Sequence, residues 1–321
     1  MINDLSKWLN LKQIRLFATS TASEYSNIAG QSEPYVFTER EVIFSGLPRH
    51  DGLLQKAQKT TADTILITPT WRKYLTATSA QQGDRWAKTD TFAQSEFAQN
   101  WLALLHSEEL RGISQKHGLN IVFAPHPNVA MYLDEMALPN HVTAIDVRSG
   151  ESYQDLFART RVALTDYSST AMDVAYLDRP VVYFQFDRDQ IYNGDHGFLP
   201  SSFTFEDDGF GPISQTVAQT VAWIDTACSG NEDPKYAQRR RQTFPFRDGQ
   251  CCARLSQAIS RLRKDRLGQS PLYVTQGDTE NPHKTFKEAL QTPRKDGVLI
   301  LPTPLQLPAQ SAAQLEMGGR S

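Results

Sequence analysis

The sequence has little cysteine and no long apolar run. Its 321 residues include three cysteines, Cys228, Cys251 and Cys252, and none of them has the spacing of a metal site. No apolar stretch approaches the roughly 20 residues of a membrane-spanning helix, and the N-terminus lacks the basic, apolar and small-residue succession of a signal peptide. We therefore expect a chain that is neither exported nor inserted into a membrane, with the reducing cytoplasm as its simplest setting.

Several common functional motifs are also missing. The sequence contains no Walker loop, no GxSxG elbow and no GxGxxG turn, which counts against P-loop NTPases, hydrolases and dehydrogenases. A net charge of -3 argues against broad nucleic-acid binding, because a face that neutralises phosphates must be basic. Net charge does not exclude a local basic pocket. The remaining composition, 40% hydrophobic and 21% charged, is typical of a soluble globular protein.

From residue 64 onward, short apolar runs alternate with helix patterns. The expected strands are Ile65–Thr68, Ile121–Ala124, Val142–Val147, Val162–Thr165 and Pro180–Phe184. The expected helices are residues 91–117, Ser152–Arg159, a helix capped by Ser168 or Ser169 that ends at Leu177, Thr216–Ala227 and Gln250–Lys264. This alternation predicts an α/β fold with a Rossmann-like, doubly wound parallel sheet.

The two ends of the chain differ from this middle part. The segment Lys7–Phe17 fits either an interfacial helix or an element packed on its own domain. Val42–Phe44 is a short strand that runs into Ser45–Asp51, where Gly and Pro predict a turn or crossover loop. Beyond Leu267 the sequence is rich in Gln, Pro, Thr and Gly, so we expect an extended or disordered tail.

Polar residues directly follow three of the predicted strands. Thr70 and Arg72 follow the first strand, His126 and Pro127 the second, and the segment Thr165-Asp166-Tyr167-Ser168-Ser169 closes the fourth. In open parallel sheets, ligands bind outside the carboxyl ends of the strands. The sequence therefore predicts a binding site at this edge of the sheet.

The segment from Thr165 to Asp173 is the strongest local signal. Unpaired amides at the start of its helix, together with the hydroxyls of Ser168 and Ser169, suit phosphate oxygens. Asp173 lies about one turn further along, placed either to accept ribose hydroxyls or to cap locally. The alternative is that both serines only cap the helix, and the residue pattern does not decide between the two.

Three more side chains have both a functional and a structural interpretation. His126 lies between two prolines that stiffen its loop, which suits a phosphate contact or a proton transfer as well as a structural role. His50, beside Arg49 and Asp51, is a candidate general base near an anionic substrate, although its spacing is a weak signal. Arg72 offers a fork of donors for a diphosphate, or forms a surface ion pair.

Together these segments resemble the CDP-glycerol glycerophosphotransferase family, the polymerases and primases of teichoic acids and related capsules. The matching stretches, in the family's order, are Ser45–Asp51, Pro69–Arg72, His126–Asn128, Thr165–Ser169 with Asp173, Arg179–Pro180 and Phe246–Gly249. The resemblance covers about residues 12–262 and implies a GT-B architecture of two Rossmann-like domains. We then expect residues 1–50 to be a remnant of the N-terminal acceptor domain with the interdomain loop, residues 51–265 the donor domain, and residues 266–321 the tail.

The resemblance also implies roles for the site residues. The Asp166–Ser169 turn would hold the CDP diphosphate, with Asp173 near the nucleotide and Thr70, Pro127, Thr165 and Tyr167 among the substrate-binding residues. His126 and Arg72 would contact the donor phosphates, and His126 would neutralise the leaving CMP. His50 would deprotonate an acceptor hydroxyl, which attacks the β-phosphorus. Positioning and charge stabilisation carry such a reaction, so no metal and no cofactor are expected.

The expected activity is transfer of glycerol phosphate, or a similar polyol phosphate, to a growing wall or capsule polymer with release of CMP. The expected partners are CDP-glycerol or a related CDP-polyol and a lipid-linked or polymer acceptor, with no nucleic acid. A lipid-linked acceptor implies a cytoplasmic chain with peripheral contact at the inner face of the cell membrane. The alternatives are a GT-B glycosyltransferase that uses a nucleotide sugar, and a non-catalytic nucleotide-binding remnant.

Overall fold

The computed structural model describes residues 5–30, 34–75, 77–82, 85–146, 151–192 and 203–264. The chain forms two compact units. Among the described residues, the first unit comprises residues 5–52 and 241–264, and the second comprises Leu53–Arg240. The sequence-based boundaries placed residues 241–264 in the donor domain, whereas their contacts group them with the N-terminal segment. The expected tail, residues 266–321, lies outside the described residues.

The second unit is built on a six-stranded sheet. Its strands are β3 (Thr64–Thr68), β6 (Asn120–Phe123), β7 (Val142–Ala144), β8 (Thr160–Thr165), β9 (Val181–Phe184) and β10 (Ile213–Ser214). Every strand pair is parallel, in the spatial order β10-β9-β8-β3-β6-β7. Numbered along the chain, this order is the 3-2-1-4-5-6 arrangement of doubly wound nucleotide-binding sheets. The expected α/β fold is therefore confirmed.

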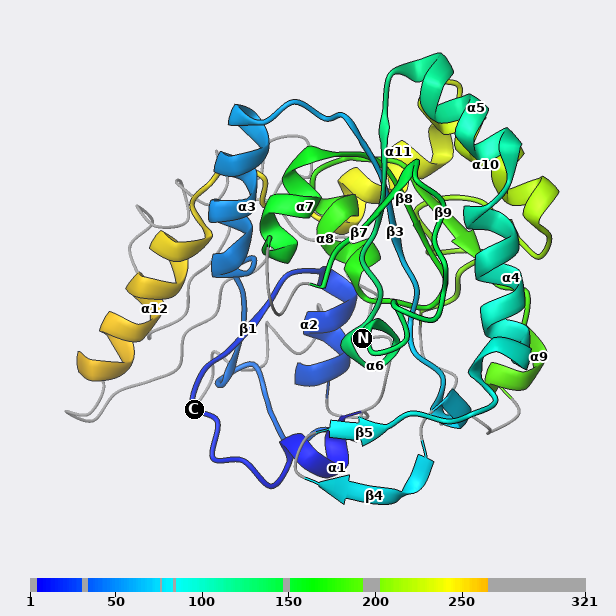
Figure 1. The fold of residues 1–321 in the computed structure, drawn as a ribbon. Coiled ribbons are helices and arrows are strands. Elements are labelled where there is room, and N and C mark those ends of the chain that lie inside the picture. The colour runs from blue at the N-terminus through cyan, green and yellow to red at the C-terminus, as the bar shows by residue number, and fades with distance from the viewer. Residues whose placement is uncertain are drawn as a thin grey trace. The chain divides into compact units, whose positions relative to one another are not determined.

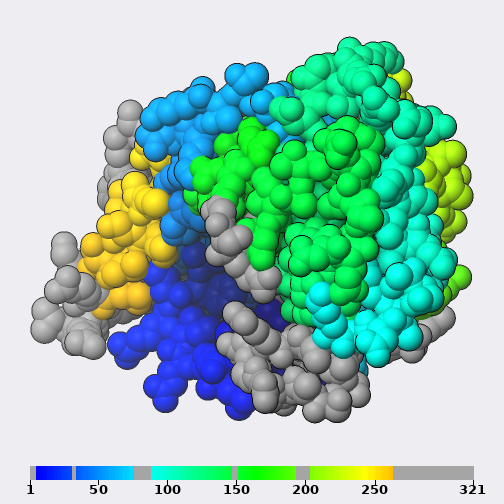
Figure 2. All heavy atoms as spheres, in the orientation of Figure 1, coloured from blue at the N-terminus to red at the C-terminus, as the bar shows by residue number. Residues whose placement is uncertain are grey.

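Helices cover both faces of this sheet (Figure 1). Because side chains alternate along a strand, Ile65 and Ile67 of β3 share one face while Leu66 lies on the other. The first face packs on α4 (Glu96–Leu105), α5 (Glu108–His117) and α10 (Val217–Cys228) in one apolar cluster. The other face packs on α7 (Tyr153–Arg159) and α8 (Thr170–Tyr176). In the space-filling view, α4 and α5 form one continuous side of this unit, in cyan to blue-green (Figure 2).

The helix expected over residues 91–117 is wrong in one respect, because the structure divides it. A 3₁₀ turn, η2 (Phe92–Gln94), precedes α4, and a break at residues 106 and 107 separates α4 from α5. The Ser107 hydroxyl accepts the amide of Leu110 at 3.2 Å, so Ser107 caps a new helix rather than continuing the old one.

Several short elements carried no periodic signal in the sequence. They are η1 (Lys73–Leu75), the antiparallel pair β4 (Ala77–Gln82) and β5 (Arg85–Ala87), α6 (Pro127–Ala130), α9 (Arg188–Gln190) and α11 (Pro234–Thr243). Helix α11 has little apolar surface, and buried charge holds it instead. Its Arg240 lies 3.0 Å from Asp178 and 2.5 Å from Glu232.

The first unit contains a small parallel β-α-β arrangement. Strands β1 (Phe17–Thr19) and β2 (Val42–Phe44) pair in parallel, and α2 (Ala22–Ala29) connects them. The segment Lys7–Phe17 contributes the end of α1 (Ser6–Leu9) and the start of β1. Leu9 is buried in the unit's core, with Ile14 and Phe17 packed against it, whereas Trp8 and Leu11 are exposed.

The turn or crossover loop expected over Ser45–Asp51 is only half correct. Gly46 adopts a left-handed φ of 74°, but a helix, α3 (Pro48–Lys59), begins two residues later. Proline suits the first position of a helix because its missing N–H would have no partner there. His50 and Asp51 therefore lie in the first turn of a helix and not in a loop. The last helix, α12 (Cys251–Lys264), also belongs to this unit.

Candidate functional site at the carboxyl ends of the strands

The second unit brings polar residues together where the strand order reverses. The chain runs from β3 outward to β6 and β7, then returns to place β8 on the other side of β3. In doubly wound sheets, ligands bind at such a switch point, outside the carboxyl ends of the two central strands, and we call this expected binding place the crevice. Hydroxyl groups join these ends: Thr165 Oγ1 donates to the carbonyl of Thr68 at 2.6 Å, and Thr68 Oγ1 lies 3.0 Å from Thr170 Oγ1.

Arg72, in the loop after β3, belongs to a fully buried ion-pair cluster. Its Nη2 is 2.9 Å from Asp166 Oδ2 and its Nε is 2.6 Å from Asp187 Oδ2, while Nη1 donates to the carbonyl of Thr70 at 2.6 Å. The rings of Phe97 and Tyr167 lie 5.3 and 5.2 Å from the guanidinium carbon. Arg72 is 0% exposed, so the expected surface ion pair is instead a buried one.

The cluster places the single positive charge of Arg72 between two carboxylates. Burial by itself lowers the pKa of the Arg72 guanidinium, but the charges and hydrogen bonds of Asp166 and Asp187 raise it above its ordinary value. Burial and the charge of Asp187 also raise the pKa of the Tyr167 phenol. Arg72 is thus a permanent cation, and Tyr167 stays neutral beside it.

Asp166 also organises the backbone around the crevice. Its carboxylate accepts the amide of Thr70 at 2.9 Å and the amide of Tyr167 at 2.6 Å. The loop after β3 and the turn after β8 are therefore held by one side chain. Because Asp166 also binds Arg72, both of its carboxylate oxygens already have partners within the protein.

Ser168 and Ser169, expected either to cap the helix or to contact phosphate, have different surroundings. Ser168 Oγ accepts the amide of Thr170 at 3.2 Å and lies 2.9 Å from its hydroxyl, so Ser168 takes the local capping role. Ser169 occupies the N-cap position of α8 without a side-chain cap bond, and it is exposed. Asp173 lies in the first turn of α8 and is half-buried.

His126 lies beside this crevice at the end of β6. Its amide donates to the carbonyl of Pro69, and its ring lies 6.1 Å from that of Trp71. The ring Nδ1 accepts the amide of Asn128 at 3.2 Å, which makes His126 the N-cap of α6, with Pro127 at the first position. Because Nδ1 is an acceptor, the neutral ring carries its proton on Nε2.

The predicted site residues therefore fall into two groups. Arg72, Asp166 and Tyr167 are buried and contact one another, and Thr165 is buried and bonds to the carbonyl of Thr68. The half-buried or exposed residues at the crevice are Thr70, His126, Pro127, Ser168, Ser169 and Asp173. Among the described residues, Thr70 Oγ1 is buried without a hydrogen-bond partner, so its hydroxyl has an unused donor and acceptor.

One residue of the Arg72 cluster is absent from the residues predicted from the sequence. Asp187 follows β9 and completes the Arg72 cluster, although its own strand had been recognised. The rule that found Thr70 and His126, a polar residue shortly after a buried strand, would also have found Asp187 in Phe184-Gln185-Phe186-Asp187.

The remaining catalytic candidate, His50, belongs to the first unit. It is 2% exposed, and its ring meets the edge of the Phe244 ring at a centroid distance of 6.1 Å and an interplanar angle of 84°. Within the described residues, no group of three or more His, Cys, Asp or Glu side chains is placed to hold a metal ion. No described helix has the length and apolarity required to cross a membrane.

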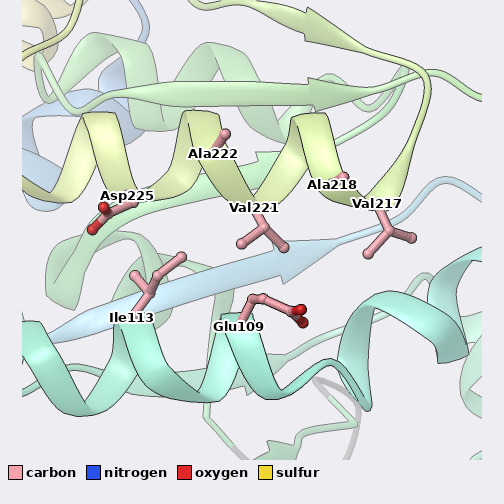
Figure 3. Close-up of a pocket in the computed structure, with 7 residues that line it drawn as sticks. All are labelled: Glu109, Ile113, Val217, Ala218, Val221, Ala222 and Asp225. Atoms are coloured by element: carbon pink, nitrogen blue, oxygen red, sulfur yellow. The ribbon is translucent and has the colours of Figure 1, made fainter.

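A surface groove of about 530 Å³ lies elsewhere, between α5 and α10. Figure 3 shows Ile113 and Val221 pointing toward one another across it. Its lining is Glu109, Ile113, Val217, Ala218, Val221, Ala222 and Asp225. The groove is lined by α5 and α10, and none of the predicted site residues is among its lining.

A doubly wound parallel sheet with polar residues gathered at its switch point defines a Rossmann-like domain of the nucleotide-binding class. The chain belongs to the CDP-Glycerol:Poly(glycerophosphate) glycerophosphotransferase family, whose model matches residues 4–261. The family predicted from the sequence motifs is therefore confirmed.

Two curated proteins are similar to the chain over most of its length. It is 28% identical over 270 residues to the Minor teichoic acid biosynthesis protein GgaB of Bacillus subtilis (strain 168), covering 83% of this chain and 29% of that protein. It is 23% identical over 255 residues to the Teichoic acid ribitol-phosphate polymerase TarK of Staphylococcus aureus (strain NCTC 8325 / PS 47), covering 77% and 46%. The chain thus spans less than half of either relative.

A solved structure shares the fold. The structure of the Wall Teichoic Acid Polymerase TagF superposes with a TM-score of 0.51 at 20% sequence identity, covering 79% of this chain and 59% of that chain.

Proposed function

We propose that this chain transfers glycerol phosphate, or a similar polyol phosphate, from a CDP-activated donor to a growing wall or capsule polymer and releases CMP. The observation that carries the proposal is the group of polar residues at the carboxyl ends of β3, β6 and β8 beside the switch point, in a chain that belongs to the glycerophosphotransferase family. The names of GgaB, TarK and TagF, all concerned with teichoic acid, support a wall polymer as the product.

The half-buried and exposed residues of the crevice supply the donor contacts in this proposal. Ser168, Ser169 and Thr70 donate hydroxyl hydrogen bonds to the diphosphate, and His126 donates from Nε2–H. Asp173 lies near the nucleotide part of the donor. Arg72 is assigned a different task from the one the sequence suggested: its guanidinium is already bound by Asp166 and Asp187, so it holds the phosphate-binding turn in shape instead of touching phosphate.

The chemistry is a displacement at phosphorus. His50 accepts the proton of the acceptor hydroxyl, whose oxygen forms a bond to the β-phosphorus. The bond from that phosphorus to the bridging oxygen breaks, and CMP leaves with the bridging oxygen and its negative charge. The hydrogen bond from His126 stabilises this charge, so the protein contributes positioning and electrostatic stabilisation.

The acceptor in this proposal is a lipid-linked or polymeric chain, reached at the inner face of the cell membrane. The exposed side chains of Trp8 and Leu11, next to Lys7 and Lys12, support a peripheral contact there. An indole ring beside lysines is suited to the boundary between lipid headgroups and water.

A binding titration with a turnover assay tests the proposed function. The purified chain is titrated with CDP, CDP-glycerol and UDP, and CMP release from CDP-glycerol is followed with a polymer acceptor. We expect binding of both cytidine nucleotides and weaker binding of UDP. A chain that binds no cytidine nucleotide overturns the proposal. Release of UDP from a nucleotide sugar would identify a glycosyltransferase, and cytidine binding without turnover would identify a nucleotide-binding remnant.

A further inference from the structure

Asp51 joins two segments of the first unit that are far apart in the sequence, the start of α3 and the start of α12. It lies in the first turn of α3, and its carboxylate accepts the amides of Cys251 and Cys252 at 2.9 and 2.7 Å. The first amides of a helix have no partner within the helix. Asp51 therefore caps the start of α12 across a separation of 200 residues.

The ionised form of Asp51 is the one that makes this contact. Burial acts to raise the pKa of the Asp51 carboxyl, but the hydrogen bonds from Cys252 and Cys251 outweigh it and lower the pKa. A carboxylate at a helix start is also favoured by the helix dipole.

Further contacts hold the backbone just before α3. Arg254 of α12 is buried; it donates to the carbonyl of Ser45 at 3.3 Å and forms an ion pair with Asp248. Gly46 packs so tightly on Cys251 that an added Cβ would lie 2.5 Å from its Sγ. The segment from Ser45 to Asp51 is thus attached to α12 on both sides of Pro48.

The same connection reaches the ring of His50. Phe244, which meets the His50 ring edge-on, lies seven residues before Cys251, where α12 begins. Between them, Phe246 packs on Phe44 at a centroid distance of 4.7 Å. One stretch of chain, from Phe244 to Cys251, therefore contacts the imidazole and also supplies an amide that Asp51 binds.

We propose that Asp51 is a positioning residue for His50: by fixing α12 to the first turn of α3, it sets the direction of the imidazole. This inference rests on the proposed function, in which His50 takes the proton of the acceptor hydroxyl. The direction of a general base matters because a displacement of about 1 Å can cost on the order of a hundredfold in rate. Asp51 itself does not touch the reacting atoms.

Three variants test the proposal by kcat and KM. Asp51→Ala removes both carboxylate oxygens that accept the amides of α12. Asp51→Asn keeps one side-chain oxygen on a side chain of the same length. Ser107→Ala is the matched control, because it removes the cap of α5, a helix that carries none of the site residues. We expect kcat for CMP release to fall about tenfold to hundredfold in Asp51→Ala and less in Asp51→Asn. KM for CDP-glycerol and the CDP affinity should stay within about twofold, and Ser107→Ala should retain kcat.

Hydrogen exchange separates this inference from the proposed function. The amide of His50 donates to the carbonyl of Leu47 at 2.9 Å, so exchange of a peptide covering residues 47–53 reports on the first turn of α3. We expect faster exchange there in Asp51→Ala whether or not the wild-type chain turns over. If the wild type releases no CMP, the proposed function fails. Hydrogen exchange of residues 47–53 then tests by itself whether Asp51 fixes α12 to the first turn of α3. Unchanged exchange or unchanged kcat in Asp51→Ala overturns the positioning role, as does an equal loss of kcat in Ser107→Ala.

Discussion

The guanidinium of Arg72 lies 2.9 Å from the carboxylate of Asp166, and neither side chain is exposed to solvent. Arg72 lies in the loop after β3 and Asp166 directly follows β8, so this ion pair spans the two strands that border the switch point. Asp187 binds the same guanidinium from the end of β9. The turn that carries Ser168 and Ser169 therefore begins at a residue, Asp166, that a buried ion pair holds in place.

Replacing Arg72 tests this support. Arg72→Met should lower the free energy of unfolding by about 3–5 kcal/mol, because it leaves two buried carboxylates without a partner. Urea denaturation measures the change. Arg111→Met is the control: Arg111 pairs with Glu108 on the exposed face of α5, where the expected loss is about 0–1 kcal/mol. A loss below about 1 kcal/mol in Arg72→Met would show that the buried pair is not needed for stability.

Replacing His126 tests the donor site. His126→Asn should weaken CDP binding about tenfold, equivalent to about 1.4 kcal/mol, because the Nε2–H donor is lost. Asparagine is a good N-cap residue, so α6 should keep its start. Calorimetric titration with CDP measures the affinity, and His106→Asn, at the exposed end of α4, is the control. Equal CDP affinities in the wild type and His126→Asn would remove His126 from the donor site.

The stability contribution of Asp51 should depend on pH. Its pKa in the folded chain is lowered from the ordinary 3.8, so the contribution is fully present above that value and is lost as pH falls through the folded pKa. At pH 7, Asp51→Ala should cost about 0.5–2 kcal/mol in unfolding free energy, the usual range for a lost helix cap. The difference in unfolding free energy between the wild type and Asp51→Ala should become smaller below about pH 4.

Denaturant unfolding at several pH values from 7 to 3 measures the unfolding free energies of the wild type and of Asp51→Ala. Ser107→Ala is again the control, since a serine cap does not titrate and its cost should stay constant. A difference between wild type and Asp51→Ala that is equally large at pH 3 and pH 7 would contradict a cap formed by the charged carboxylate.

The three cysteines should differ in reactivity. Cys252 is exposed, whereas Cys228 and Cys251 are buried, and burial raises the pKa of Cys228 to about 11. Slight burial, a hydrogen bond with Asp51 and the charge of Asp51 raise the pKa of the Cys252 thiol. Cys252 should therefore react first with iodoacetamide, but slowly at neutral pH, and faster in Asp51→Ala because more thiolate forms.

Mass spectrometry of the labelled chain locates the reacted thiol and gives the rate, with Cys252→Ser as the control that should remain unlabelled under the same conditions. Labelling of Cys228 or Cys251 before Cys252 would contradict the burial pattern, and an unchanged rate in Asp51→Ala would contradict the influence of Asp51.

Much of the second unit could be predicted from the sequence because its signals are local. Ile65–Thr68 and Val162–Thr165 are apolar runs of strand length, and both are buried strands in the structure. The position of Thr70, His126 and Ser168 directly after strands indicated the site edge. The break at Ser107 and the helical start at Pro48 were missed, because one capping residue or one proline decides them within a longer helical or loop-like pattern.

The sequence by itself determined the class of fold and the family, and it indicated the sheet edge of the proposed site, since these depend on periodicity and on short motifs in order. Only the tertiary structure decided which of the polar residues are buried in ion pairs and which remain at least partly exposed. Arg72 and Asp166 look like site residues in the sequence, yet they neutralise each other in the interior, because a buried charge needs an opposite charge close by. Likewise, the contact of Asp51 with α12 joins residues 200 positions apart, a distance over which no local pattern carries information.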